Sequence, residues 1–140
     1  MGIKLIDNSH EILRALDSKK EEALEAIGLA AEGFAKANLT EFPRVDTGRL
    51  RNSVSHARNG DDEYIGTNVE YAPYVELGTG VYAETNEGQP GGGRSEPWFY
   101  KDDKGVGHIT KGMKPAHFLK KAVSNHKKEY IELAEEYMKK

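Results

Sequence analysis

The sequence predicts an α+β fold: a long N-terminal helix, a small antiparallel sheet built from hairpins, a short central helix, a long flexible loop and a C-terminal helix. Three observations indicate this order. Apolar residues recur at helical steps near both ends of the chain, an Asn-Gly dipeptide lies between two short strand-like runs, and a glycine-rich stretch follows. At 140 residues the chain fits a single domain over 1–140, with 79–112 as its glycine-rich loop or arm.

The first helix is predicted over residues 12–39 and should end before Pro43. Such a helix would be roughly 42 Å long, so we expect part of it to project or to pack on a neighbouring subunit. Gly28 and Gly33 lie inside it, each at a cost of about 1 kcal/mol relative to alanine. Either another element approaches the backbone closely or a kink is tolerated. The apolar positions recur at Leu13, Leu16, Leu24, Ile27, Ala31 and Phe34.

A hairpin and a short helix are predicted next. Residues 52–67 read as two antiparallel strands joined at residues 59–62, because Asn59-Gly60 suits the two central positions of a type I′ turn. The short helix that follows should pack on the sheet, and Gly78 stands where a left-handed C-cap would end it. Its apolar face would consist of Tyr71, Tyr74, Val75 and Leu77.

The glycine-rich stretch interrupts the regular pattern. It contains seven glycines from Gly88 onward, and only "PWFYK" and "VGHIT" have strand character, so a second hairpin across "DDKG" is predicted. A long loop of this kind is usually functional or disordered, and we expect a partner to order it. The last helix should begin with Pro115 in its first turn. Its apolar positions are Leu119, Val123, His126, Tyr130, Leu133 and Tyr137.

Composition excludes several classes of protein. There is no cysteine, so neither a disulfide framework nor a thiolate site is available, and an intracellular setting fits. No secretion signal or run of roughly 18 apolar residues is present, so we expect neither secretion nor a membrane span. Net charge is −7 over residues 1–110 and +4 over 111–140. This polarity could help identical subunits or stacked rings to associate.

Asp46-Thr47-Gly48 matches the active-site signature of aspartic proteases, in which two carboxylates share one proton. A chain with one copy would have to dimerise, and the nearby Arg49 and Arg51 would keep the carboxylate ionised. The structural alternative is simpler: Asp46 or Thr47 caps a short helical turn whose Leu50 anchors it to the core. We therefore expect a structural cap, with an aspartic-type protease as a remote alternative.

Other chemistry finds no support in the pattern. The five histidines lack a His-Glu-x-x-His spacing, and "GQPGGGRS" lacks the ending of a phosphate-binding loop. Local basic groups occur, but the chain is net acidic, which argues against specific nucleic-acid recognition. We expect no enzymatic activity, no cofactor and no metal.

Three segments together resemble one family. They are "PRVDTGRLRNSV" at 43–54, "IGTNVEYAPYVELGTG" at 65–80 and "KPAHFLKKAV" at 114–123. In this order and spacing they resemble the head–tail joining (tail-completion) neck proteins of long-tailed bacteriophages and prophages. The chain departs from that pattern at Arg44, Leu77 and His117, and 81–112 corresponds to the variable region of the family.

The resemblance implies a non-enzymatic structural virion assembly protein, assembled in the host cytoplasm and located at the neck or tail end. Such proteins form homo-oligomeric rings, commonly of six subunits, which join the head connector or stopper to the tail tube or tail terminator. DNA would at most pass through the ring, and no membrane is involved. A tail terminator or minor tail protein that caps the tail tube is the alternative.

Two groups of residues are candidates for roles in such an assembly. Aromatic and arginine side chains dominate interface energetics, and the long loop should gain partners when a neighbour docks. The predicted subunit or partner interface residues are Arg49, Glu76, Arg94, Trp98, Phe99 and Tyr100. The predicted structural-motif residues are Asp46, Thr47, Gly48, Leu50, Tyr71, Tyr74, Gly78 and Phe118.

Overall fold

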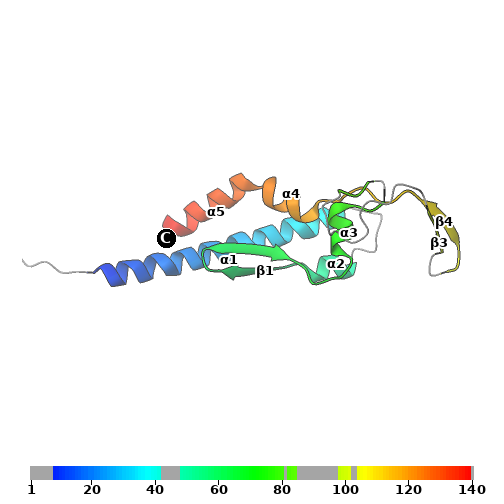
Figure 1. The fold of residues 1–140 in the computed structure, drawn as a ribbon. Coiled ribbons are helices and arrows are strands. Elements are labelled where there is room, and N and C mark those ends of the chain that lie inside the picture. Colours follow the sequence, from blue (N-terminus) through cyan, green and yellow to red (C-terminus); the bar gives the residue numbers. More distant parts are fainter. Residues whose placement is uncertain (1–7, 42–47, 81, 85–97, 102–103, 140) are drawn as a thin grey trace, which may run out of the picture.

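The computed structural model describes residues 8–41, 48–80, 82–84, 98–101 and 104–139, and its architecture is α+β as predicted. Helix α1 (Ser9–Thr40) is the spine of the molecule. The hairpin of β1 (Ser55–Asn59) and β2 (Asp62–Gly66) lies along one side of this helix, and two C-terminal helices lie along another (Figure 1).

Helix α1 is buried on one narrow stripe of small residues, and Leu39 at its end is fully buried. The stripe starts only at Ala23. Before it, Ile12, Leu13 and Leu16 are all exposed, although they continue the apolar period. The N-terminal end of α1 therefore projects past the end of the C-terminal helix, as Figure 1 shows, which confirms that the helix is longer than the body it supports.

The first hairpin is present, but two details of its prediction were wrong. Helix α2 (Gly48–Ser53) occupies the start of the predicted strand, so β1 begins at Ser55. Asn59 pairs with Asp62, which leaves Gly60 and Asp61 as the two-residue turn, one position later than expected. Gly60 has φ of 64°, whereas Asn59 and Asp61 have negative φ, so the turn is not type I′.

The core lies at the C-terminal end of α1, where several segments of the chain meet. Helix α3 (Ala72–Leu77) packs there on other helices rather than on the sheet, because Ala72 and Val75 join the cluster around Leu39. Gly78 ends α3 and donates its N–H to the carbonyl of Tyr74 at 2.9 Å. Its φ of 83° is positive, but its ψ of 175° differs from the predicted left-handed cap. The buried cluster consists of Ala35, Leu39, Leu50, Val54, Val69, Ala72, Val75, Ala116, Phe118 and Ala122.

The second hairpin is also present. Strands β3 (Trp98–Lys101) and β4 (Gly107–Thr110) pair antiparallel and extend away from the body, which makes them an arm (Figure 1). The two strands form a sheet separate from β1 and β2.

The predicted last helix is two helices, α4 (Phe118–Ser124) and α5 (Lys127–Lys139). Pro115 does not open α4, because the next two residues are bonded to the end of α3: Ala116 N–H donates to Val75 O at 2.8 Å and His117 N–H to Glu76 O at 3.2 Å. The predicted apolar position Val123 is exposed. After the break, the His126 ring stacks on Phe34 of α1 with 3.5 Å between ring centroids.

Candidate functional site

The segment that carries the Asp-Thr-Gly motif leads directly into α2. Asp46 and Thr47 lie outside the described residues, and Gly48 is the first residue of the helix. Leu50 is completely buried in the core. Leu50 therefore anchors α2 to the core, as predicted if the motif has a structural role.

Arg49 projects from α2 and pairs with Glu70. Its two terminal nitrogens donate to the two Glu70 oxygens at 2.9 and 3.0 Å, a bidentate geometry. The guanidinium also lies 5.7 Å from the centre of the Tyr71 ring. The hydrogen bond from Arg49 lowers the pKa of Glu70, and both side chains are exposed. Arg49 is thus held in one orientation at the surface, where a partner could meet it.

Glu76, another predicted interface residue, has an internal role. Its Oε2 accepts from Leu119 N–H at 2.9 Å and its Oε1 from Lys120 N–H at 3.0 Å, so the carboxylate caps the first turn of α4. His117, with φ of 51°, lies beside it and contacts Glu84 through Nε2 at 2.8 Å. The side chain of Glu76 joins α3 to α4.

Four of the predicted structural-motif residues, Tyr71, Tyr74, Gly78 and Phe118, lie in α3, at its ends or at the start of α4. Phe118 is completely buried at the start of α4, and the half-buried Tyr71 packs against the same core. Tyr74 is half-buried on α3. Position 78 requires glycine for two reasons. Its φ is positive, and the Met113 carbonyl lies so close that a Cβ on residue 78 would be 2.8 Å from the carbonyl oxygen.

The arm presents apolar side chains to solvent. Phe99 and Ile109 are register partners across β3 and β4, with 62% and 79% of their surfaces exposed. Val106, which directly precedes β4, is also exposed. The backbones of Trp98 and Tyr100 belong to β3, while their side chains, like all of Arg94, lie outside the described parts of the molecule. The arm therefore carries an exposed apolar pair, which is costly in water unless a partner covers it.

The base of the arm is fixed to the body by contacts that the sequence did not suggest. Thr79 N–H donates to Met113 O, and Met113 N–H donates to Thr79 Oγ1, both at 2.9 Å. Gly112, with φ of 116°, packs so closely that a Cβ there would lie 2.1 Å from Thr79 O. The segments around Thr79 and Met113 are thus joined where they leave the core.

An apolar groove lies beside α3 and has a volume of about 470 Å³. Its lining combines the end of the first hairpin, α3 and α4. The apolar lining residues are Val69, Ala72, Pro73, Leu77 and Leu119. The groove has the concave, apolar form that suits insertion of a side chain from a partner.

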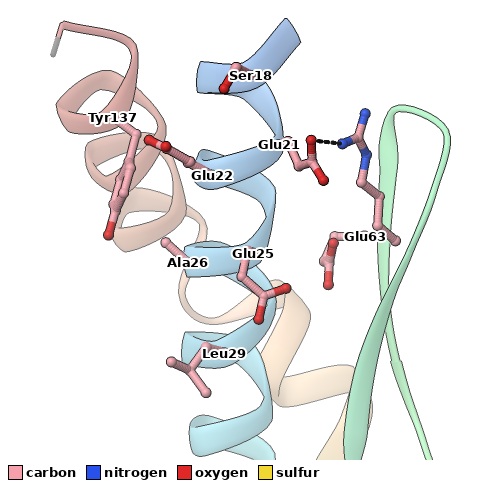
Figure 2. A pocket seen from close by; sticks show the side chains of 9 residues that line it. Ser18, Glu21, Glu22, Glu25, Ala26, Leu29, Glu63 and Tyr137 are labelled. Atoms are coloured by element: carbon pink, nitrogen blue, oxygen red, sulfur yellow. Dashed lines mark ion pairs between the residues drawn. The ribbon is translucent and has the colours of Figure 1, made fainter.

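A second cavity, of about 600 Å³, lies beside α1 between the first hairpin and α5 (Figure 2). Figure 2 shows Glu21 and Glu25 directed from α1 toward the hairpin, with Glu63 opposite, whereas Glu22 is directed toward α5. Arg58 lies 3.7 Å from both Asp17 and Glu21.

Charged groups thus line the contact between α1 and the hairpin. We call Glu25 and Glu32 of α1 with His56, Arg58 and Glu63 of the hairpin the polar seam. His56 Nε2 lies 2.9 Å from Glu25 Oε1, and this hydrogen bond raises the pKa of His56. Burial raises the pKa of Glu63, and the nearby His56 partly offsets this effect.

Comparison with known proteins gives one match. Residues 3–78, more than half of the chain, match the family model described as "Bacteriophage HK97-gp10, putative tail-component". No curated protein and no solved structure matches. Among the described helices, none is both long and apolar enough to cross a membrane. The matched residues contain α1, α2, the first hairpin and α3, and by this match the chain belongs to the HK97-gp10-like family of bacteriophage tail components.

Proposed function

We propose that the protein forms a ring at the phage neck that joins the head connector to the tail. Its family supports a structural role in the tail or neck of the virion. The observation that carries the more specific proposal is the arm, which has a fixed base and an exposed apolar pair, Phe99 and Ile109. No enzymatic step is part of this role.

The arm of one subunit would bind a different surface of the next subunit. Such a heterologous contact closes into a ring when the rotation between neighbours permits. The groove beside α3 is the acceptor that we assign to it, because the apolar lining matches Phe99 and Ile109 in character. Ile12, Leu13 and Leu16 on the projecting end of α1 offer a further apolar surface for the tail or connector.

Binding to isolated heads and tails tests the position in the virion at which the protein is incorporated. Purified protein is mixed with tail-less heads and with isolated tails, and bound protein is measured after sedimentation and located by negative-stain imaging. The joining role predicts binding at the connector of the heads and at the matching end of the tails. The double variant Phe99→Ser/Ile109→Ser should lose this binding, whereas Ile131→Ser, which removes another exposed apolar side chain from α5, should retain it.

Other outcomes separate the alternatives. Binding to tails with none to heads would select a tail terminator or minor tail protein. Binding to neither would refute an assembly role at this joint. Equal binding by the double variant would remove the arm from the contact.

A further inference from the structure

The polar seam occupies a place where an apolar contact is expected. Because side chains alternate along a strand, and because His56 pairs with Ile65 and Arg58 with Glu63, these four side chains share one face of the hairpin. That face is turned toward α1, since His56 contacts Glu25 and Arg58 contacts Glu21. Ionisable groups are costly in such a position unless each has a partner.

Glu63 has no hydrogen-bond partner, and His56 and Arg58 act on its carboxylate through their charge alone. Both of its carboxylate oxygens are shielded from solvent, and neither accepts a hydrogen bond. The nearby Glu25 adds a second negative charge, and the only imidazole at this point, His56, is already bonded to Glu25. A buried carboxylate left in this state costs free energy that protonation or a bound cation would recover.

The geometry brings three metal-ligand atoms together. One atom each from Glu25, His56 and Glu63 can be chosen so that all lie within 4.8 Å of one another. The residues come from α1, β1 and β2, so three separate elements converge on one point. On the other side of the imidazole, His56 Nδ1 lies 3.8 Å from Glu32 Oε1 and makes no hydrogen bond.

The backbone of α1 leaves room for this cluster. A Cβ at Gly28 would lie 2.2 Å from Glu63 Oε1 and 2.7 Å from His56 Cδ2, whereas one at Gly33 would meet nothing within 4 Å. Gly28 therefore allows the carboxylate and the imidazole to reach the helix. The space is filled by two ligand side chains and not by apolar packing.

We propose that Glu25, His56 and Glu63 bind a divalent transition-metal ion, for which Zn²⁺ is the best match. Zinc accepts imidazole nitrogen and carboxylate oxygen at about 2.0–2.2 Å, and one imidazole with two carboxylates suits it better than Mg²⁺ or Ca²⁺, which prefer oxygen ligands. The ion would replace the Nε2 proton of His56, which is released to solvent. Its charge balances the two carboxylates, and Glu32 can accept a hydrogen bond from Nδ1–H, which orients the ring.

The bound ion would join the hairpin to α1 and stabilise the fold. It needs no catalytic role and does not depend on the ring proposed above. Because the ligands come from both sides of the contact, the free energy of binding adds to the free energy of unfolding.

The test uses the full chain without a histidine tag, freed of metal with a chelator and then dialysed. Zn²⁺ is titrated by calorimetry, Co²⁺ by its visible absorption, and thermal unfolding is followed with and without Zn²⁺. We expect one Zn²⁺ per chain, a raised Tm, and Co²⁺ bands typical of nitrogen and oxygen ligands. His56→Gln and Glu63→Gln should each lower the affinity by more than about 10-fold.

Two further variants keep the result interpretable. Glu25→Gln alters a ligand whose side chain is 69% exposed, so it should lower Zn²⁺ affinity without disturbing the fold. His108→Gln on the exposed arm should leave binding unchanged. Absence of Zn²⁺ binding by the parent chain would overturn the proposal. Undiminished binding by the folded Glu25→Gln, His56→Gln and Glu63→Gln variants would also overturn it, since the ion would then be elsewhere.

Discussion

Gly28 is the residue on which the contact between α1 and the first hairpin most directly depends. A methyl group there would overlap the carboxylate of Glu63 and the ring of His56, whereas at Gly33 it would enter open space. Both glycines are helical, so the intrinsic helix propensity is the same for both. A comparison of alanine substitutions at the two positions therefore separates the effect of packing from the effect of helix propensity.

We predict opposite effects for the same substitution at these two positions. Gly28→Ala should lower the free energy of unfolding by about 1–3 kcal/mol because it overpacks the contact. Gly33→Ala should raise it by about 0.5–1 kcal/mol, because alanine is the better helix former. Chemical denaturation of both variants measures the difference. An equal stabilisation by both would show that the hairpin does not pack on Gly28.

The polar seam also predicts a dependence of stability on pH. The folded-state pKa values of Glu63 and His56 are both raised, from 4.5 and 6.5. The folded protein then binds more protons than the unfolded chain, so the free energy of unfolding falls as pH rises. Glu63 causes one decrease, between about pH 4.5 and its folded pKa. His56 causes a second, between about pH 6.5 and its own folded pKa. Glu63→Gln cannot titrate and should lose the first of these two decreases.

Denaturation of the parent chain and of Glu63→Gln between pH 4 and 8, with a chelator present, measures this effect. The parent should lose stability relative to the variant as pH rises through the titration of Glu63. A difference that stays constant over the range would contradict the raised pKa of Glu63.

For individual residues, the sequence could predict the buried apolar side chains but not the members of the polar seam. Leu50 and Phe118 are apolar residues within recognisable motifs, and both are completely buried. His56 and Glu63 belong to the seam because of strand register and the approach of α1, neither of which appears as a spacing in the sequence. A search for metal motifs along the chain therefore could not find them.

At the scale of elements, the junction between α3 and α4 depends on one side chain. Glu76 accepts two backbone N–H groups of α4 and is largely shielded from solvent. We predict that Glu76→Ala lowers the free energy of unfolding by about 0.5–2 kcal/mol, as the loss of a helix N-cap does. Arg49→Ala, which breaks an exposed ion pair, should have a smaller effect.

Thermal and chemical unfolding of both variants, with the helix content checked by circular dichroism, decides between these roles for Glu76. A Glu76→Ala protein as stable as the parent but defective in assembly would support the interface role that the sequence predicts for Glu76.

Element types were predictable where local signals agree, and boundaries were not. The period of α1 and the strand character of β3 and β4 gave the right elements. The last helix divides because backbone groups of Ala116 and His117 pair with the end of α3, and because His126 stacks on Phe34. These are tertiary contacts, so the apolar period alone could not show the break.

At the scale of the whole molecule, the chain has a small core and two projecting parts. The core lies at the C-terminal end of α1, while the N-terminal end of α1 and the arm extend away from the body (Figure 1). Both carry exposed apolar residues, Ile12, Leu13 and Leu16 on one and Phe99, Val106 and Ile109 on the other. A protein with this shape gains further buried apolar surface when it associates.

The arm should therefore contribute to assembly and little to the stability of the subunit. We predict that Phe99→Ser/Ile109→Ser leaves the thermal unfolding of the isolated subunit almost unchanged, because both side chains are exposed there. Ile131→Ser serves as the matched control on α5. A large loss of subunit stability in the double variant would show that the arm packs on its own body.

The most direct measurement is the mass of the protein in solution by light scattering, alone and after addition of isolated tails or tail-less heads, for the parent chain and for Phe99→Ser/Ile109→Ser. The proposed role predicts a closed ring of the parent chain, either in free solution or on those ends, and no ring of the folded double variant. A parent protein that stays a monomer or dimer with both preparations would contradict it.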